Sequence, residues 1–205
     1  MMGPEEIERA SMAVIGREMG AWAGPAENLP VLKRVIHTTA DFDFVRNLLF
    51  SPNAVQLGRE ALRRGASVVT DTAMAAAGVS KPSAARWGVE VVCRMADPEV
   101  GEEARRRGVT RAVVCMERAV EATPDAVFAI GNAPTALMRL CELIREGRAR
   151  PSLVVGVPVG FVNVVESKEV LAATDVPQIA AMGRKGGSTV AAAILNALFY
   201  GMEDR

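Results

Sequence analysis

The sequence predicts an α/β fold: a doubly wound, mostly parallel sheet of five or six strands with helices on both faces, in a single domain over residues 1–205. Three observations predict it. Short apolar runs recur along the chain, helical segments with recognisable ends separate them, and the composition is 50% hydrophobic but only 4% aromatic. Such a composition suits layered helices and buried strands better than a β-sandwich.

The expected strands are continuous apolar runs, the pattern of strands that are covered on both faces. They are residues 67–70, 89–93, 112–115, 126–130 and 153–157. A further apolar run, 31–36, leads directly into the polar segment 37–44, which we interpret as a loop like those that follow the strands.

The helices expected between the strands have start and stop signals. Ser51 is expected to cap a helix with Pro52 in its first turn and Gly65 at its end. Similar signals bound three more helices, at 97–108, at 132–147 and from 188 onwards. Strand and helix alternate several times, which predicts right-handed crossovers and the doubly wound sheet.

Charge and cysteine usage exclude several functions. Lys plus Arg and Asp plus Glu number 24 each, so no global field favours nucleic acid or a membrane as partner. The three cysteines, 22 and 26 residues apart, fit neither a zinc site nor a disulfide framework. No signal peptide and no apolar stretch of about 18 residues is present. We therefore expect a cytoplasmic protein without a metal or another cofactor.

Ligands of open parallel sheets bind beyond the carboxyl ends of the strands. The loops to inspect are therefore 70–74, 130–135, 156–163, 183–188 and 37–44. Residues 183–188, GRKGGS, offer free backbone N–H groups with Arg184 and Lys185, which suit a carboxylate or phosphate, although such a turn can also be a simple helix cap. Neither a Walker loop nor a dinucleotide fingerprint occurs.

His37 is the only histidine and the first candidate for an acid or base, because histidine titrates near neutral pH. A purely structural histidine is the alternative. Asp41 and Asp43 could orient the imidazole or form turns, and Asp71 has the same two interpretations. Arg34 could bind an anion or pair with a surface acid.

Five strings resemble the precorrin-8X methylmutase family and together extend over nearly the whole chain. They are RVIHTTADFDF (34–44), FSPNAV (50–55), IGNAPTAL (130–137), GVPVGFVNVVESKE (156–169) and GRKGGS followed by VAAAILNAL (183–198).

The resemblance implies an isomerase of vitamin B12 biosynthesis. The reaction would be a [1,5]-sigmatropic shift of a methyl group from C11 to C12 of precorrin-8X or cobalt-precorrin-8, giving hydrogenobyrinic or cobyrinic acid. By analogy with the family's catalytic histidine, His37 would protonate the tetrapyrrole substrate or share its proton. No metal ligand, nucleotide or redox partner is implied.

The family's substrate contacts, matched position by position, fall on Ser11, Arg34, Ser80 and Arg111, with Arg184 and Lys185 as weaker matches. The resemblance also implies a homodimer with its pocket at or near the subunit interface. Ala73 and Ala76 replace Asn and Lys that cobalt-pathway relatives often have, whereas TTADFDF after His37 resembles the cobalt-first branch. We therefore expect cobalt-precorrin-8 as substrate.

Two other functions remain open at this point. The chain could be a corrinoid carrier without catalysis, because the same cationic loops would serve both roles. It could also be an α/β enzyme that holds a sugar phosphate or nucleotide on GRKGGS.

Overall fold

The computed structural model describes residues 2–203; residue 1 and residues 204–205, which the expected domain includes, lie outside the described residues. One sheet lies at the centre, with the strand order β1-β6-β5-β4-β2-β3. Its strands are β1 (Leu48–Phe50), β2 (Val68–Thr70), β3 (Val91–Val92), β4 (Val127–Ile130), β5 (Leu153–Gly156) and β6 (Gln178–Ala181). Only the edge strand β1 is antiparallel to its neighbour, so the predicted fold class is confirmed.

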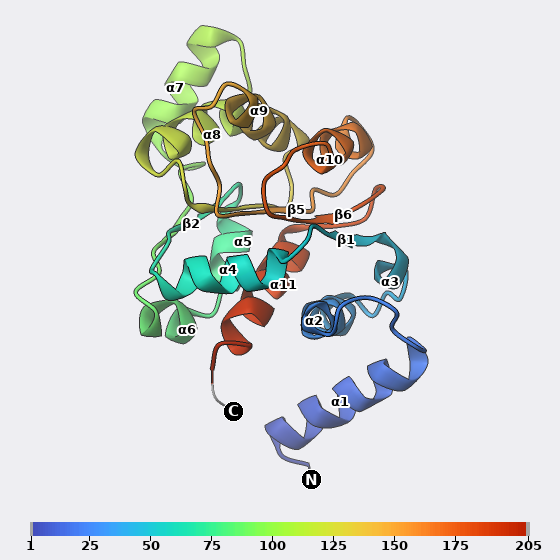
Figure 1. Ribbon diagram of the computed structural model, residues 1–205. Helices are drawn as coiled ribbons and strands as arrows, with labels where there is room; N and C mark the ends of the chain where they lie inside the picture. Colours follow the sequence, from blue (N-terminus) through green and yellow to red (C-terminus); the bar gives the residue numbers. More distant parts are fainter. Residues whose placement is uncertain (1, 204–205) are drawn as a thin grey trace.

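Helices cover both faces of the sheet (Figure 1). On one face lie α7 (Pro98–Arg107), α8 (Arg111–Ala122), α9 (Pro134–Arg145) and α10 (Val164–Ala172). On the other lie α2 (Leu29–Thr39), α4 (Ala54–Arg63), α5 (Ala73–Gly78) and α11 (Ser188–Tyr200), with α6 (Lys81–Arg86) packed against α11. The remaining helices are α1 (Pro4–Glu18), η1 (Ala26–Asn28) and α3 (Phe44–Asn47).

Alternate residues of each strand point to opposite faces and so build two cores. Val127 and Ala129 belong to the core beneath α2, α4 and α11, whereas Phe128 and Ile130 belong to the core beneath α8 and α9. The central strands are therefore apolar on both sides, as their unbroken runs predicted.

Helix α1 lies outside this sandwich and packs on α2, which makes α2 a buried middle element (Figure 1). Val31 and Leu32 of α2, like Val35 and Ile36 one turn later, face the core. That spacing of buried positions is helical, so the run 31–36 is a helix. Our interpretation of 37–44 as a loop was wrong for residues 37–39, which continue α2, and for Phe44, which begins α3.

Two further expectations were wrong. Residues 112–115 lie in α8, because the buried stripe continues through Met116, Ala119 and Val120 with helical spacing. Ser51 does not cap α4, which begins after Asn53; instead its hydroxyl accepts a hydrogen bond from the Gln178 backbone N–H at 2.9 Å and fastens β1 to β6. None of the described helices is long and apolar enough to cross a bilayer.

Candidate active site

His37 occupies the last turn of α2, and its side chain is exposed. The helix ends at Thr39, and the next residue, Ala40, has a left-handed backbone (φ 52°) and donates its N–H to the Ile36 carbonyl at 2.7 Å. Val35 and Ile36 anchor this turn in the core, so the backbone beneath the imidazole is held rigidly. The position of the His37 backbone is therefore fixed by the burial of its two neighbours in the core.

The imidazole separates two hollows. One, of about 400 Å³, lies between α1 and α2 and has Ser11, Ile7, Val14 and Phe42 in its mainly apolar wall. The other, of about 280 Å³, lies between α2 and α11, and its wall holds the polar side chains of Arg34, Thr38, Thr189, Asn196 and Tyr200. His37 is common to both walls, so a ligand in either hollow would reach it.

Ser11 and Arg34 are thus brought close to His37, one in each hollow. The Ser11 hydroxyl donates to the Ile7 carbonyl one turn earlier in α1, at 2.9 Å, which leaves its oxygen able to accept. The Arg34 guanidinium pairs with Glu8 of α1 at 2.5 Å and stacks on the Tyr200 ring, 5.1 Å from its centroid. It is therefore a partly buried cation with one carboxylate partner in the wall of a cavity.

Ser80 and Arg111 do not line either of these two hollows. Ser80 caps α6: its hydroxyl donates to the Ser83 Oγ at 2.9 Å, and its backbone N–H donates to the Asn196 Oδ1 at 2.8 Å. Ser80 therefore holds Asn196, which lines the second hollow. Arg111 is the exposed first residue of α8, on the opposite face of the sheet from α2.

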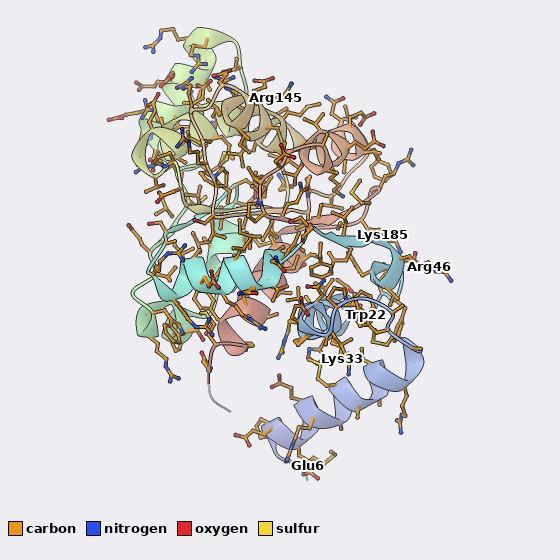
Figure 2. All side chains as sticks on the ribbon, viewed as in Figure 1. Glu6, Trp22, Lys33, Arg46, Arg145 and Lys185 are labelled. Atoms are coloured by element: carbon orange, nitrogen blue, oxygen red, sulfur yellow. The ribbon has the colours of Figure 1, made fainter. Side chains whose placement is uncertain are left out.

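Lys185 joins the 183–188 turn to the segment that follows His37. Figure 2 labels Lys185 on the same side of the molecule as Arg46 of α3. The Lys185 ammonium donates to the Asp41 and Asp43 carboxylates, at 2.6 Å each. These hydrogen bonds lower the pKa of Asp41 and raise the pKa of Lys185. The Asp43 backbone N–H also donates to Asp41 Oδ1 at 2.9 Å, so the two aspartates form an Asx-type turn. Arg184 stands over the exposed Phe161 ring, 5.6 Å from its centroid.

Asp71 has the second of the two roles considered for it: it forms turn contacts with backbone N–H groups and does not orient the imidazole. Its fully buried carboxylate accepts hydrogen bonds from the backbone N–H groups of Gly131, Asn132 and Ala133 at 2.9, 2.8 and 2.7 Å. Burial raises the pKa of Asp71, and the three amide donors oppose that shift. The carboxylate thereby ties the end of β2 to the turn that opens α9.

Lys168 was not among the site residues predicted from the sequence. Its side chain is fully buried in α10, and the ammonium donates to the carbonyls of Gly183 and Lys185 at 2.7 and 2.8 Å. Burial lowers the pKa of this amine to about 8. The available signal was the spacing of Val164, Ser167, Lys168 and Leu171, which places the lysine on the buried face of an amphipathic helix.

A larger hollow of about 710 Å³ lies elsewhere, over α7, α8 and α9, and only charged side chains line it. There Arg107 pairs with Glu103 and Glu117, and Arg139 pairs with Glu117. This is a network of surface ion pairs without an apolar wall, so we do not regard it as a site.

The fold and the hollows around His37 define an α/β protein whose candidate site combines one acid–base group with cations suited to carboxylates. The sequence profile of the precorrin-8X methylmutase family matches residues 6–201. The chain therefore belongs to the precorrin-8X methylmutase family, and the expected enzyme class, an isomerase, is confirmed.

Individual relatives agree. The cobalt-precorrin-8 methylmutase of Priestia megaterium is 47% identical over 195 residues, which are 95% of this chain and 87% of that protein. The precorrin-8X methylmutase of Pseudomonas aeruginosa is 42% identical, over 95% of this chain and 94% of that protein. The crystal structure of a precorrin-8X methylmutase from Thermus thermophilus superimposes with a TM-score of 0.87, at 42% identity over 95% of this chain and 96% of that one.

Proposed function

We propose that the chain moves a methyl group from C11 to C12 of precorrin-8X or cobalt-precorrin-8 in vitamin B12 biosynthesis, with His37 as its catalytic residue. The observation that carries this proposal is the position of the only histidine, exposed at the junction of two hollows that also hold Ser11 and Arg34. Family membership supplies the reaction class.

In the proposed mechanism the protonated imidazole of His37 gives its proton to the conjugated macrocycle. The added charge makes the π system a better acceptor, so the bond from the methyl group to C11 breaks as the bond to C12 forms. The proton then returns to the imidazole, and the product is an isomer of the substrate. A general acid of this kind contributes a factor of about 10² to 10⁴, and a fixed ring geometry supplies much of the rest.

The substrate's carboxylates need local cations, because the chain has no net charge. We propose Arg34, Arg184 and Lys185 for this role and Ser11 as a hydrogen-bonding neighbour of His37. In the structure Arg34 and Lys185 have carboxylate partners of their own. A substrate carboxylate would replace such a partner without leaving a buried charge unpaired. We also propose Ser80 and Arg111 as substrate contacts, although both stand apart from the two hollows.

We propose the cobalt-loaded form, cobalt-precorrin-8, as the natural substrate. The Priestia megaterium relative at 47% identity and the Salmonella typhimurium relative at 43% are both named for that substrate. The TTADFDF segment after His37 supports the same branch.

We further propose that the chain acts as one catalytic domain over residues 1–205, in the cytoplasm, as a homodimer with its pocket near the interface. Two features support this. Phe161 and Val162, at the tip of the loop before α10, are 84% and 77% exposed, which suits a surface covered by a partner. The cysteines are all free, which suits a reducing compartment. Sedimentation analysis tests the dimer, and a concentration-independent monomer would contradict it.

The decisive experiment compares the wild type with His37→Ala on both precorrin-8 forms, following the visible spectrum, because moving the methyl group alters the chromophore. We expect kcat to fall by about 10² to 10⁴ while product binding persists. Gln56→Ala, an exposed change on α4, is the control for handling and folding and should keep full activity. Equal rates for His37→Ala and the wild type would refute the catalytic role, and a carrier would show no turnover in either protein.

A further inference from the structure

Lys168 is a charged side chain in a place where an apolar one would fit. It lies in α10 between Val164 and Leu171, both buried, and its own side chain is fully buried. Burying an ammonium costs more free energy than burying a methionine of similar shape. Stability alone therefore does not account for a lysine here, and its contacts have to be considered.

Both hydrogen-bond acceptors of the Lys168 ammonium are main-chain carbonyls of one turn. They are those of Gly183 and Lys185, at 2.7 and 2.8 Å, in the connection between β6 and α11. An ammonium carries three donors on one atom, so it can hold two carbonyls at once and fix the path of the backbone between them.

The same turn is held on its other side by the loop after β5. The Gly187 N–H donates to the Val157 carbonyl at 2.8 Å, and the Gly160 N–H donates to the Arg184 carbonyl at 3.2 Å. A Cβ atom on Gly186 would stand 2.1 Å from the Val157 oxygen, so only glycine permits this approach. The turn is thus clamped between α10 and this loop.

The turn carries two connections toward His37. The Lys185 side chain binds Asp41 and Asp43, in the segment directly after the last turn of α2. Helix α11 begins at the end of the turn, and its Thr189 and Asn196 line the second hollow beside His37. A displacement of the turn would therefore move both the cation and one wall of the proposed site.

We propose that Lys168 is a positioning residue for the methyl shift: from beneath, it fixes the 183–187 turn so that Lys185 and the start of α11 keep their places beside His37. The inference rests on the proposed function of this site. Lys168 does not touch the substrate and acts through the carbonyls of the turn. Both the charged and the neutral amine can donate to two carbonyls, so the role persists across the neutral and mildly alkaline range.

Lys168→Met tests the inference, with Gln178→Met as a matched control. The Gln178 amide is 2% exposed and also donates to two carbonyls, those of Leu171 and Thr174 at 2.9 and 3.2 Å, but at the other end of α10. We expect Lys168→Met to raise KM about tenfold with kcat within about threefold of the wild type. Gln178→Met should leave both constants unchanged.

A second arm asks whether Lys168 acts through the turn. Lys185→Ala should raise KM to a similar extent, and the double variant should be no worse than Lys185→Ala alone, because both changes disable the same connection. Fully additive effects, or a wild-type KM in Lys168→Met, would overturn the inference. Should Lys168→Met not fold, Lys168→Gln, which keeps one donor group, is expected to give a smaller rise in KM.

Hydrogen exchange separates this inference from the proposed function. Without any substrate, the amides of residues 183–187 should exchange faster in Lys168→Met than in Gln178→Met or the wild type. Equal exchange overturns the positioning role even if the enzyme is active. Failure of the wild type to convert either precorrin-8 form refutes the proposed function, whatever the exchange data show.

Discussion

Asp71→Asn tests how strongly one carboxylate holds the end of β2 to the turn that opens α9. The native carboxylate accepts three backbone N–H groups, one on Oδ1 and two on Oδ2, and is itself fully buried. An asparagine keeps a single acceptor oxygen. Its best orientation satisfies Asn132 and Ala133 and turns the amide NH₂ toward the N–H of Gly131.

The cost follows from those contacts. The Gly131 N–H loses its acceptor, at about 1 to 3 kcal/mol for a buried donor, and two charge-assisted bonds become neutral ones, at about 1 kcal/mol each. Relief of the burial penalty that raises the pKa of Asp71 offsets part of this. We expect the free energy of unfolding to fall by about 3 kcal/mol, which a domain with about 5 to 15 kcal/mol survives.

Urea titrations followed by circular dichroism measure this change, with the m-value as a check that the unfolding transition is otherwise the same. Asp125→Asn is the matched control, because Asp125 is exposed at the start of the neighbouring strand, and its effect should stay within about 0.5 kcal/mol. A stability of Asp71→Asn equal to or above that of the wild type would refute our reasoning, since burial would then outweigh the amide contacts.

Three further predictions concern the site and its support. Glu8→Gln removes the carboxylate that competes for Arg34, so KM should fall about two- to fivefold, as expected for a pair worth up to about 1 kcal/mol; an unchanged KM counts against Arg34 as a substrate contact. Burial lowers the pKa of Lys168 to about 8, well below the value of about 10.4 in the unfolded chain. Between these values the unfolded state binds more protons at Lys168, so this residue's contribution to the free energy of unfolding should rise by about 2 kcal/mol from pH ~8 to pH ~10. Burial raises the pKa of Cys115 and of Cys141 to about 11, which acts in the opposite sense over the same range. Urea titrations should therefore show the rise as a growing difference in stability between the wild type and Lys168→Met, because the cysteines are the same in both proteins. Gly186→Ala would place its Cβ 2.1 Å from the Val157 oxygen and should displace the turn. We expect KM to rise about tenfold or more, and an unchanged KM would contradict this prediction.

The central strands β4 and β5 were predictable because each is apolar on both sides over its whole length, as in Val127–Ile130. The two strands at the β1 edge were not, for a physical reason. Strand β1 has only three residues, of which one is exposed, and β6 begins with a glutamine and ends with two alanines. Such segments become strands through their partners rather than through their own side chains.

The candidate site was likewise predictable only in part. His37, Ser11 and Arg34 could be named from the sequence by chemistry and resemblance, and the structure brings them together. The bond from Lys185 to Asp41 and Asp43 joins segments about 140 residues apart, and no local pattern encodes such a pair.

The pairing of β1 with β6 sets the order in which the protein can be completed on the ribosome. Residues 48–50 leave the exit tunnel early, but their partner strand at 178–181 is made about 130 residues later, or about 6 to 26 seconds at ordinary rates of translation. Helix α11, against which α2 buries its apolar side, emerges later still. A nascent chain therefore has no finished candidate pocket until α11 has left the exit tunnel, and until then the apolar face of α2 lacks the helix that covers it.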